Sequence, residues 1–284
     1  MYNPIIIIGA PRSGTNMLRD LLVKLDSFET WPCDEINYIW RYGNKSYPSD
    51  EFVPSMATSE VKSFIRKKFD DLADKTHASY IVEKTCANSL RVDFVEEVIP
   101  DAKYIFIVRD GRDVIASAMH RWKAKLDIPY LLKKVRYVPF RDLPYYGLRY
   151  LKNRLEKIVS NEKRLSLWGP QLNELGQLLK SYTLEQVCAI QWKRCIENAE
   201  SGFNNIDNDR LIRVKYEKFV SDPITEFKRI CDFLDIDIEE EKVIELTRFI
   251  SDKSVGKGRK ELDFNELEIH KLISETLNDL EYTK

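Results

Sequence analysis

The segment from Gly9 to Asn16 has the residue types of a loop that binds a phosphate or sulfate group. Gly9 and Gly14 have four residues between them, which is the glycine spacing of a P-loop, whose backbone N–H groups surround the anion. Thr15 stands where a P-loop has its lysine, and Asn16 stands where a serine or threonine would hold magnesium. The loop therefore suits a phosphate-like group but lacks two parts of nucleoside-triphosphate chemistry.

Three cations follow apolar segments that predict buried strands. Arg12 comes shortly after Ile5-Ile6-Ile7-Ile8, Lys84 shortly after Tyr80-Ile81-Val82, and Arg109 directly after Lys103–Val108. The carboxyl ends of parallel strands lie at one edge of a sheet, where α/β proteins bind their ligands. We therefore expect Arg12, Lys84 and Arg109 to converge on one anionic ligand.

The hydrophobic pattern predicts the elements that would position these residues. Strands are predicted at 5–8, 80–82, 103–108 and 211–214, and helices at 17–22, 59–76, 89–98, 184–200, 223–234, after Gly111 to about Trp122 and after Glu239. The segment 26–40 is predicted to be a loop. Strands that alternate with helices predict an α/β fold with a parallel sheet.

The length of the chain predicts one domain with an insertion. A chain of 284 residues can bury a full α/β core, so we expect residues 1–284 to form a single domain. Residues 123–180 are rich in Lys, Tyr, Leu and Pro and carry several turn markers. We expect them to form an irregular helical insertion that binds an acceptor.

Charge, hydropathy and cysteine usage exclude several classes of protein. The chain has 45 Lys and Arg against 46 Asp and Glu, so no overall field attracts nucleic acid. No stretch approaches the roughly 18 apolar residues of a membrane span, and the N-terminus lacks a signal peptide, so we expect a cytoplasmic protein. The five cysteines and three histidines are scattered, which predicts reduced thiols and no metal site. Oligomeric state has no sequence signal.

Several motifs, taken in order, resemble the sulfotransferases that use 3′-phosphoadenosine 5′-phosphosulfate (PAPS). They are Gly9–Thr15, Val82 through Asn88, Val108–Ser117, Trp168-Gly169-Pro170, Gln191–Cys195, Arg213–Glu217 and Ser254–Arg259. The resemblance implies a P-loop-like three-layer fold with helices on both faces of the sheet. It also implies PAPS as donor, 3′-phosphoadenosine 5′-phosphate (PAP) as product, and no metal. The chain departs from the family at Asn16, where a second Thr or Ser is commoner, and at Cys86, where Pro is usual.

The resemblance also implies which residues bind the nucleotide. For the 5′-phosphosulfate they are Arg12, Ser13, Gly14, Thr15 and Asn16. Arg109 and Ser117 match the residues that hold the 3′-phosphate. Tyr216, Lys257, Gly258 and Arg259 match segments that close over the nucleotide. We expect Arg112 and Asp113 to form an ion pair at the start of their helix instead of contacting the ligand.

Sulfuryl transfer needs cationic groups at the leaving phosphate and a base for the acceptor hydroxyl. Lys84 and Arg12 are the candidates for the cations. Relatives that act on tyrosine or glycans have a glutamate about twenty residues beyond the phosphate loop, and Glu35 lies at that position. Asp34 is the alternative base, and an exposed acidic loop without a catalytic role is the third possibility.

The first functional hypothesis is a PAPS-dependent sulfotransferase that acts on a hydroxyl, with a saccharide favoured as acceptor. A small-molecule alcohol, a phenol or a peptide tyrosine stays open. The alternatives are a P-loop nucleotide kinase and a non-catalytic anion-binding module. Aromatic residues could line an acceptor pocket or belong to the core: Trp31, Tyr38, Trp40, Tyr42, Tyr145, Tyr146 and Trp168.

Overall fold

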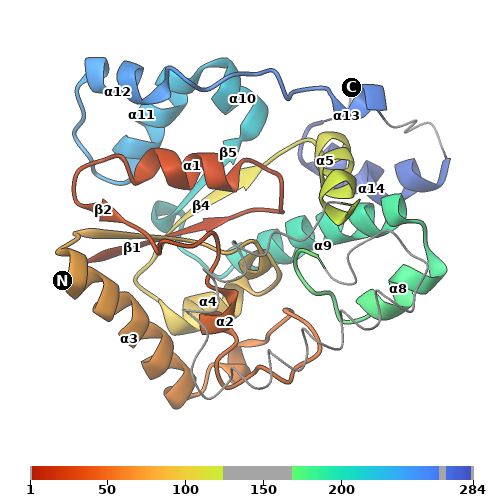
Figure 1. The fold of residues 1–284 in the computed structure, drawn as a ribbon, viewed down its shortest axis with the longest axis horizontal. Helices are drawn as coiled ribbons and strands as arrows, with labels where there is room; N and C mark the ends of the chain where they lie inside the picture. The colour runs from red at the N-terminus through yellow and green to blue at the C-terminus, as the bar shows by residue number, and fades with distance from the viewer. Residues whose placement is uncertain (1, 124–167, 262–266, 283–284) are drawn as a thin grey trace.

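The computed structural model describes residues 2–123, 168–261 and 267–282, and within these it leaves the side chains of residues 259, 261 and 267 undescribed. Its centre is a parallel sheet of five strands in the order β2-β3-β1-β4-β5 (Figure 1). The strands are β1 Asn3–Ile8, β2 Phe28–Glu29, β3 Tyr80–Lys84, β4 Lys103–Val108 and β5 Leu211–Lys215. The predicted α/β fold and its four predicted strands are confirmed.

The unbroken apolar runs of β1 and β4 follow from cover on both faces of the sheet. Ile5 and Ile7 pack into one core and Ile6 and Ile8 into the other, and all four are at most 1% exposed. Strands buried on both faces need apolar residues at every position instead of an alternation. The two central strands are therefore enclosed by apolar side chains on both faces, at the centre of the sheet whose strand ends carry the site.

Helices cover both faces (Figure 1). One face carries α1 Thr15–Leu22, α10 Tyr216–Ser221, α11 Pro223–Phe233 and α12 Glu240–Thr247. The other carries α3 Ser59–Thr76, α4 Val92–Val98, α5 Gly111–Lys123 and α9 Leu184–Phe203. The other helices of the described residues are α2 Asn37–Trp40, α8 Leu175–Ser181, α13 Gly258–Glu261 and α14 Leu267–Asp279, with 3-10 turns at Pro54–Met56, Cys86–Leu90 and Asn208–Arg210.

The segment 26–40 differs from the predicted loop, because it contains β2 and α2. The two-residue strand β2 has no periodicity of its own and depends on pairing with β3, where Phe28 stacks on Tyr80 at 4.4 Å. The predicted helix over 89–98 is also divided. A 3-10 turn ends at Leu90, and Arg91 interrupts the helix with an extended φ of −151° while its side chain enters a buried network.

Two of the aromatic residues considered for an acceptor pocket belong to the core. Trp31 and Trp40 are buried, and both pack edge-on against Phe69. Most of the predicted insertion, residues 124–167 with Tyr145 and Tyr146, lies outside the described residues. The single-domain organisation of residues 1–284 therefore stays a prediction. Every helix in the described part of the chain is too short or too polar to cross a bilayer.

Candidate active site

The predicted phosphate loop connects β1 to α1. Gly14 has the left-handed φ of 93°, and a Cβ there would lie 2.5 Å from the ring of Tyr216, so both the turn and the close approach require glycine. No described side chain caps the N-terminus of α1. The first-turn N–H groups of this eight-residue helix are therefore suited to an anion, as is the positive end of its dipole.

Arg109 and Ser117 lie beside this loop, as predicted. The guanidinium of Arg109 stacks on the ring of Tyr216, 4.4 Å from its centroid, and donates to the carbonyl oxygen of Arg12 at 3.2 Å. Arg12 Nε in turn donates to Ser117 Oγ at 2.9 Å. The structure thus joins the predicted 5′- and 3′-phosphate residues through direct hydrogen bonds.

The electrostatics of this region fit a ligand with several negative charges. Burial lowers the pKa of Arg12, and the neighbouring cations Arg121 and Arg109 lower it further. Two buried donors, Ser13 Oγ and Arg109 Nε, have no hydrogen-bond partner among the described residues. Buried donors without partners are costly, and phosphate oxygens would satisfy them. The residues present therefore fit a bisphosphorylated nucleotide.

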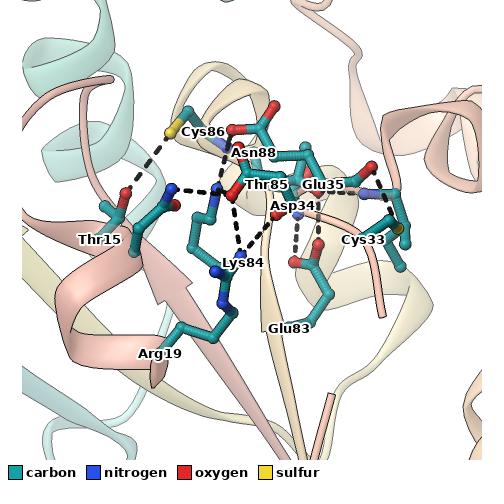
Figure 2. Close-up of polar contacts among 12 residues, drawn as sticks. Thr15, Arg19, Cys33, Asp34, Glu35, Glu83, Lys84, Thr85, Cys86 and Asn88 are labelled. Carbon is teal, nitrogen blue, oxygen red and sulfur yellow. Dashed lines mark hydrogen bonds and ion pairs between the residues drawn. The ribbon is translucent and has the colours of Figure 1, made fainter. Parts of the chain in front are cut away.

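Lys84 lies at the end of β3 and faces two carboxylates (Figure 2). Its Nζ is 3.1 Å from Glu35 Oε1 and 3.6 Å from Asp34 Oδ1, and its side chain is only 1% exposed. Burial alone would lower the pKa of Lys84, but the carboxylate of Glu35, helped by that of Asp34, outweighs it and raises the pKa. Lys84 is therefore a fixed positive charge beside the predicted base.

Asp34 and Glu35 have different surroundings. Asp34 Oδ1 accepts hydrogen bonds from Asn16 Nδ2 at 2.8 Å and from Arg19 at 3.0 Å, which tie it to α1. Glu35 Oε1 accepts from Lys84 Nζ and, at 3.3 Å, from the backbone N–H of Cys86. Asn16 therefore uses its side chain to hold Asp34, while its backbone N–H belongs to the first turn of α1.

Cys86 replaces the proline usual in the related motif and lies against the phosphate loop. Its Sγ is 3.7 Å from Thr15 Oγ1. Burial, and next to it the negative charge of Glu35, raises the pKa of the Cys86 thiol, so the thiol is neutral. Cys86 therefore has the character of a small packing residue, and the five cysteines are free thiols, as expected.

The segment from Ser254 to Gly258 lies against α5. Asp113 is buried and accepts hydrogen bonds from the backbone N–H groups of Gly256 at 2.8 Å and Gly258 at 2.6 Å. The expected Arg112–Asp113 pair is wrong, because Arg112 pairs with Asp110 at 2.8 Å and leaves Asp113 to hold this segment. The carboxylate of Asp113 also lies 3.4 Å from Arg109 Nη2, so it connects the segment from Ser254 to the cation at the end of β4.

The residues of the C-terminal motif Ser254–Arg259 differ in how closely they approach the site. The backbone carbonyl of Ser254 accepts from Arg109 at 2.7 Å, and the Ser254 and Tyr216 hydroxyls are 2.7 Å apart. Gly258 packs directly on α5, whereas Lys257 is exposed. The side chain of Arg259 lies outside the described residues.

Sequence reasoning missed three residues that hold this site together. Arg19 anchors Asp34, Asp113 anchors the segment from Ser254, and the Ser254 carbonyl meets Arg109. Two of them had a signal, since Arg19 follows Asn16 by three residues and Asp113 follows Arg109 by four, the spacings that place side chains on one helical face. Ser254 lies in the motif Ser254–Arg259, but its contact with Arg109 had no signal, because it depends on the path of the whole chain. No group of potential metal ligands occurs among the residues that the structure describes.

Comparison with known proteins agrees with this geometry. The model of the family described as "Sulfotransferase domain" matches residues 3–261. Protein-tyrosine sulfotransferase A of Caenorhabditis elegans is 22% identical over 250 residues, which cover 82% of this chain and 50% of that protein. The chain therefore spans about half the length of this curated relative.

Solved structures share the fold at low sequence identity. The sulfotransferase domain from the curacin biosynthetic pathway has a TM-score of 0.58 and 15% identity, over 97% of this chain and 98% of that one. Mouse sulfotransferase SULT7A1, complexed with PAP, has a TM-score of 0.52 and 14% identity, over 97% of this chain and 85% of that one. With the family model matching nearly the whole chain, the protein belongs to the sulfotransferase domain family.

Proposed function

We propose that the protein transfers the sulfuryl group of PAPS to an acceptor hydroxyl and releases PAP. The observation that carries this proposal is the pair Lys84–Glu35, 3.1 Å apart, beside an anion-binding loop. The loop amides from Ser13 to Asn16 and the guanidinium of Arg12 would hold the 5′-phosphosulfate, and Arg109 with Ser117 the 3′-phosphate. When bound, PAPS supplies an activated sulfuryl group whose leaving group is a phosphate.

The side chains divide the remaining work. Glu35 would take the proton of the acceptor hydroxyl as the oxygen attacks, which general-base catalysis requires of a group within hydrogen-bond reach. Lys84 would stabilise the negative charge that develops on the leaving phosphate oxygen. Asp34 is the less suitable base, because two cations, Arg19 at 3.0 Å and Lys84 at 3.6 Å, pair with its Oδ1 and favour its ionised form.

A saccharide is the first acceptor that we propose, in a cytoplasmic setting. A peptide tyrosine is the second candidate, and the likeness to the nematode protein-tyrosine sulfotransferase favours it. Both acceptors present a hydroxyl on a ring that aromatic side chains can stack against, so the reaction at Glu35 would be the same.

Calorimetric titration with PAP, ATP and ADP, with and without magnesium, tests the donor. We expect tight binding of PAP alone, independent of magnesium, followed by sulfuryl transfer from labelled PAPS to saccharides or tyrosine peptides. Magnesium-dependent binding of ATP would instead support the P-loop kinase. Binding of PAP without transfer to any acceptor, together with an unchanged outcome in Glu35→Ala, would support a non-catalytic module.

A further inference from the structure

Glu83 is a fully buried carboxylate that the proposed reaction does not use. It lies at the end of β3 next to Lys84 and is 1% exposed. Its Oε1 accepts a hydrogen bond from Thr85 Oγ1 at 2.5 Å, and its Oε2 accepts one from Asn88 Nδ2 at 2.9 Å (Figure 2). Burial of a carboxylate is unfavourable unless such donors compensate it, so its position calls for a reason.

The first hydrogen-bond path from Glu83 leads to the loop of the predicted base. Thr85 Oγ1 donates to Glu83 and accepts from the backbone N–H of Ile36 at 3.2 Å. Ile36 is the residue directly after Glu35 and the N-cap of α2. The Thr85 hydroxyl therefore fixes the backbone next to Glu35.

The second path reaches the next residue along the same loop. Asn88 donates to Glu83 and accepts from Arg91 Nε at 2.9 Å, and Arg91 donates to Asn37 Oδ1 at 2.6 Å. The side chain of Arg91 is fully buried. Both paths that start at Glu83 therefore end on Ile36 and Asn37, immediately beyond Glu35.

We infer that Glu83 is a positioning residue that, through Thr85 and Asn88, holds Glu35 against Lys84. The inference rests on the proposed function, because it gives Glu35 the role of base. Thr85 and Asn88 both donate to Glu83, so this one buried carboxylate orients the first hydrogen bond of each path. A rigid second layer of this kind matters because proton transfer and attack depend on geometry at the level of an ångström.

The test begins with Thr85→Val, which removes the hydroxyl and keeps the shape of the side chain. We expect kcat to fall by about tenfold, while the Kd for PAP measured by calorimetry stays within about twofold of wild type, because Lys84 and the phosphate loop are untouched. Thr85→Ser keeps the hydroxyl and should restore most of the kcat. Thr247→Val is the matched control, since Thr247 is also buried and its hydroxyl donates to the carbonyl oxygen of Val243 within its own helix, α12.

A double-mutant cycle with Glu35→Ala separates positioning from general destabilisation. If Thr85 acts through Glu35, adding Thr85→Val to Glu35→Ala should change kcat by less than about twofold. The same tenfold loss in both backgrounds, or a similar loss in Thr247→Val, would overturn the inference. An unchanged kcat in Glu35→Ala alone would overturn the assignment of the base itself, and the inference with it. Glu83→Gln is the further variant and is expected to resemble Thr85→Val.

Discussion

Two halves of the site lie at one edge of the sheet and are built in different ways. The cationic half consists of the loop Gly9–Gly14 with Arg12, Arg109 and Ser117, and the carboxylate half consists of Asp34, Glu35, Glu83 and Lys84. In the cationic half, backbone amides and arginines follow directly from the ends of β1 and β4. In the carboxylate half, Asp34 and Glu35 are held by hydrogen bonds from other segments of the chain, and Glu83 by hydrogen bonds from Thr85 and Asn88, which follow it.

The difference indicates a division of labour. Under the proposed function, the cationic half would determine how tightly the donor binds. The carboxylate of Glu35, 3.1 Å from the Lys84 ammonium, would contribute to the rate by taking the proton. Variants of the first half should therefore change Kd for PAP, and variants of the second half should change kcat.

The largest effect is expected for Glu35→Ala, which removes the proposed base. We expect kcat to fall by about 10² to 10⁴, the range for loss of a general base, with little change in Kd for PAP. Steady-state transfer assays and calorimetry on the same preparation measure both quantities. A loss of PAP affinity with normal turnover would contradict the assignment of kcat effects to the carboxylate half and Kd effects to the cationic half.

Arg109→Ala should show the reverse pattern. The loss of charge-assisted hydrogen bonds should weaken PAP binding by about 10- to 100-fold and leave AMP binding nearly unchanged. Arg109→Lys keeps the charge without the planar fork, so its affinity for PAP should lie between that of wild type and that of Arg109→Ala. Arg213→Ala is the control, because Arg213 pairs with Glu200 at the surface. Equal losses of affinity for PAP and AMP would contradict the assignment of the 3′-phosphate to Arg109.

Asp34→Asn tests which of the two carboxylates, Asp34 or Glu35, acts as the base. The amide oxygen can still accept from Asn16 and Arg19, so the loop should keep its place. We expect kcat to fall by less than about tenfold, because Asp34 positions but does not take the proton. A loss as large as that of Glu35→Ala, measured in the same assay, would transfer the role of base to Asp34.

Ser117→Ala should have a smaller effect in the cationic half. A single hydrogen bond contributes about 0.5 to 1.5 kcal/mol, so we expect PAP affinity to fall about 2- to 10-fold. The substitution also frees Arg12 Nε, which donates to Ser117 Oγ at 2.9 Å. An equal effect on AMP would therefore indicate that Ser117 acts only by orienting Arg12.

The smallest expected effect concerns Glu83 in the carboxylate half, whose titration should make the stability of the protein depend on pH. Burial raises the pKa of Glu83 to about 7, partly offset by its hydrogen bond from Thr85 and the charge of Lys84, while Glu35 adds to it. A raised carboxyl pKa means that the folded state binds the proton more tightly than the unfolded state. Stability therefore falls as pH rises from about 4.5 to about 7. Thermal unfolding of Glu83→Gln should show a weaker fall over this range, and identical slopes for both proteins would contradict the shift.

The cationic half was largely predictable from the sequence, and the carboxylate half only in part. Gly14 was found from the glycine spacing of its loop, and Arg12 and Arg109 because each follows a strongly apolar strand. Lys84 and Glu35 were named as a charge and a base, and their contact is a finding of the structure. Thr85 and Asn88 belong to the motif Val82 through Asn88, but nothing in the sequence indicated that they bond to Glu83 or that Thr85 accepts from Ile36, which lies far along the chain. Residue-by-residue roles stay predictions until variants are measured.

The hydrogen bond from Arg109 to the Ser254 carbonyl has a consequence for the exchange of nucleotide. Under the proposed function, the 3′-phosphate would compete with this carbonyl for the guanidinium, and the dianion is the stronger acceptor. Entry of the nucleotide would then replace the Ser254 carbonyl, and departure would reverse the replacement. The carbonyl oxygen of Arg12 and the carboxylate of Asp113 are further acceptors for Arg109, so the buried cation would keep partners in both states.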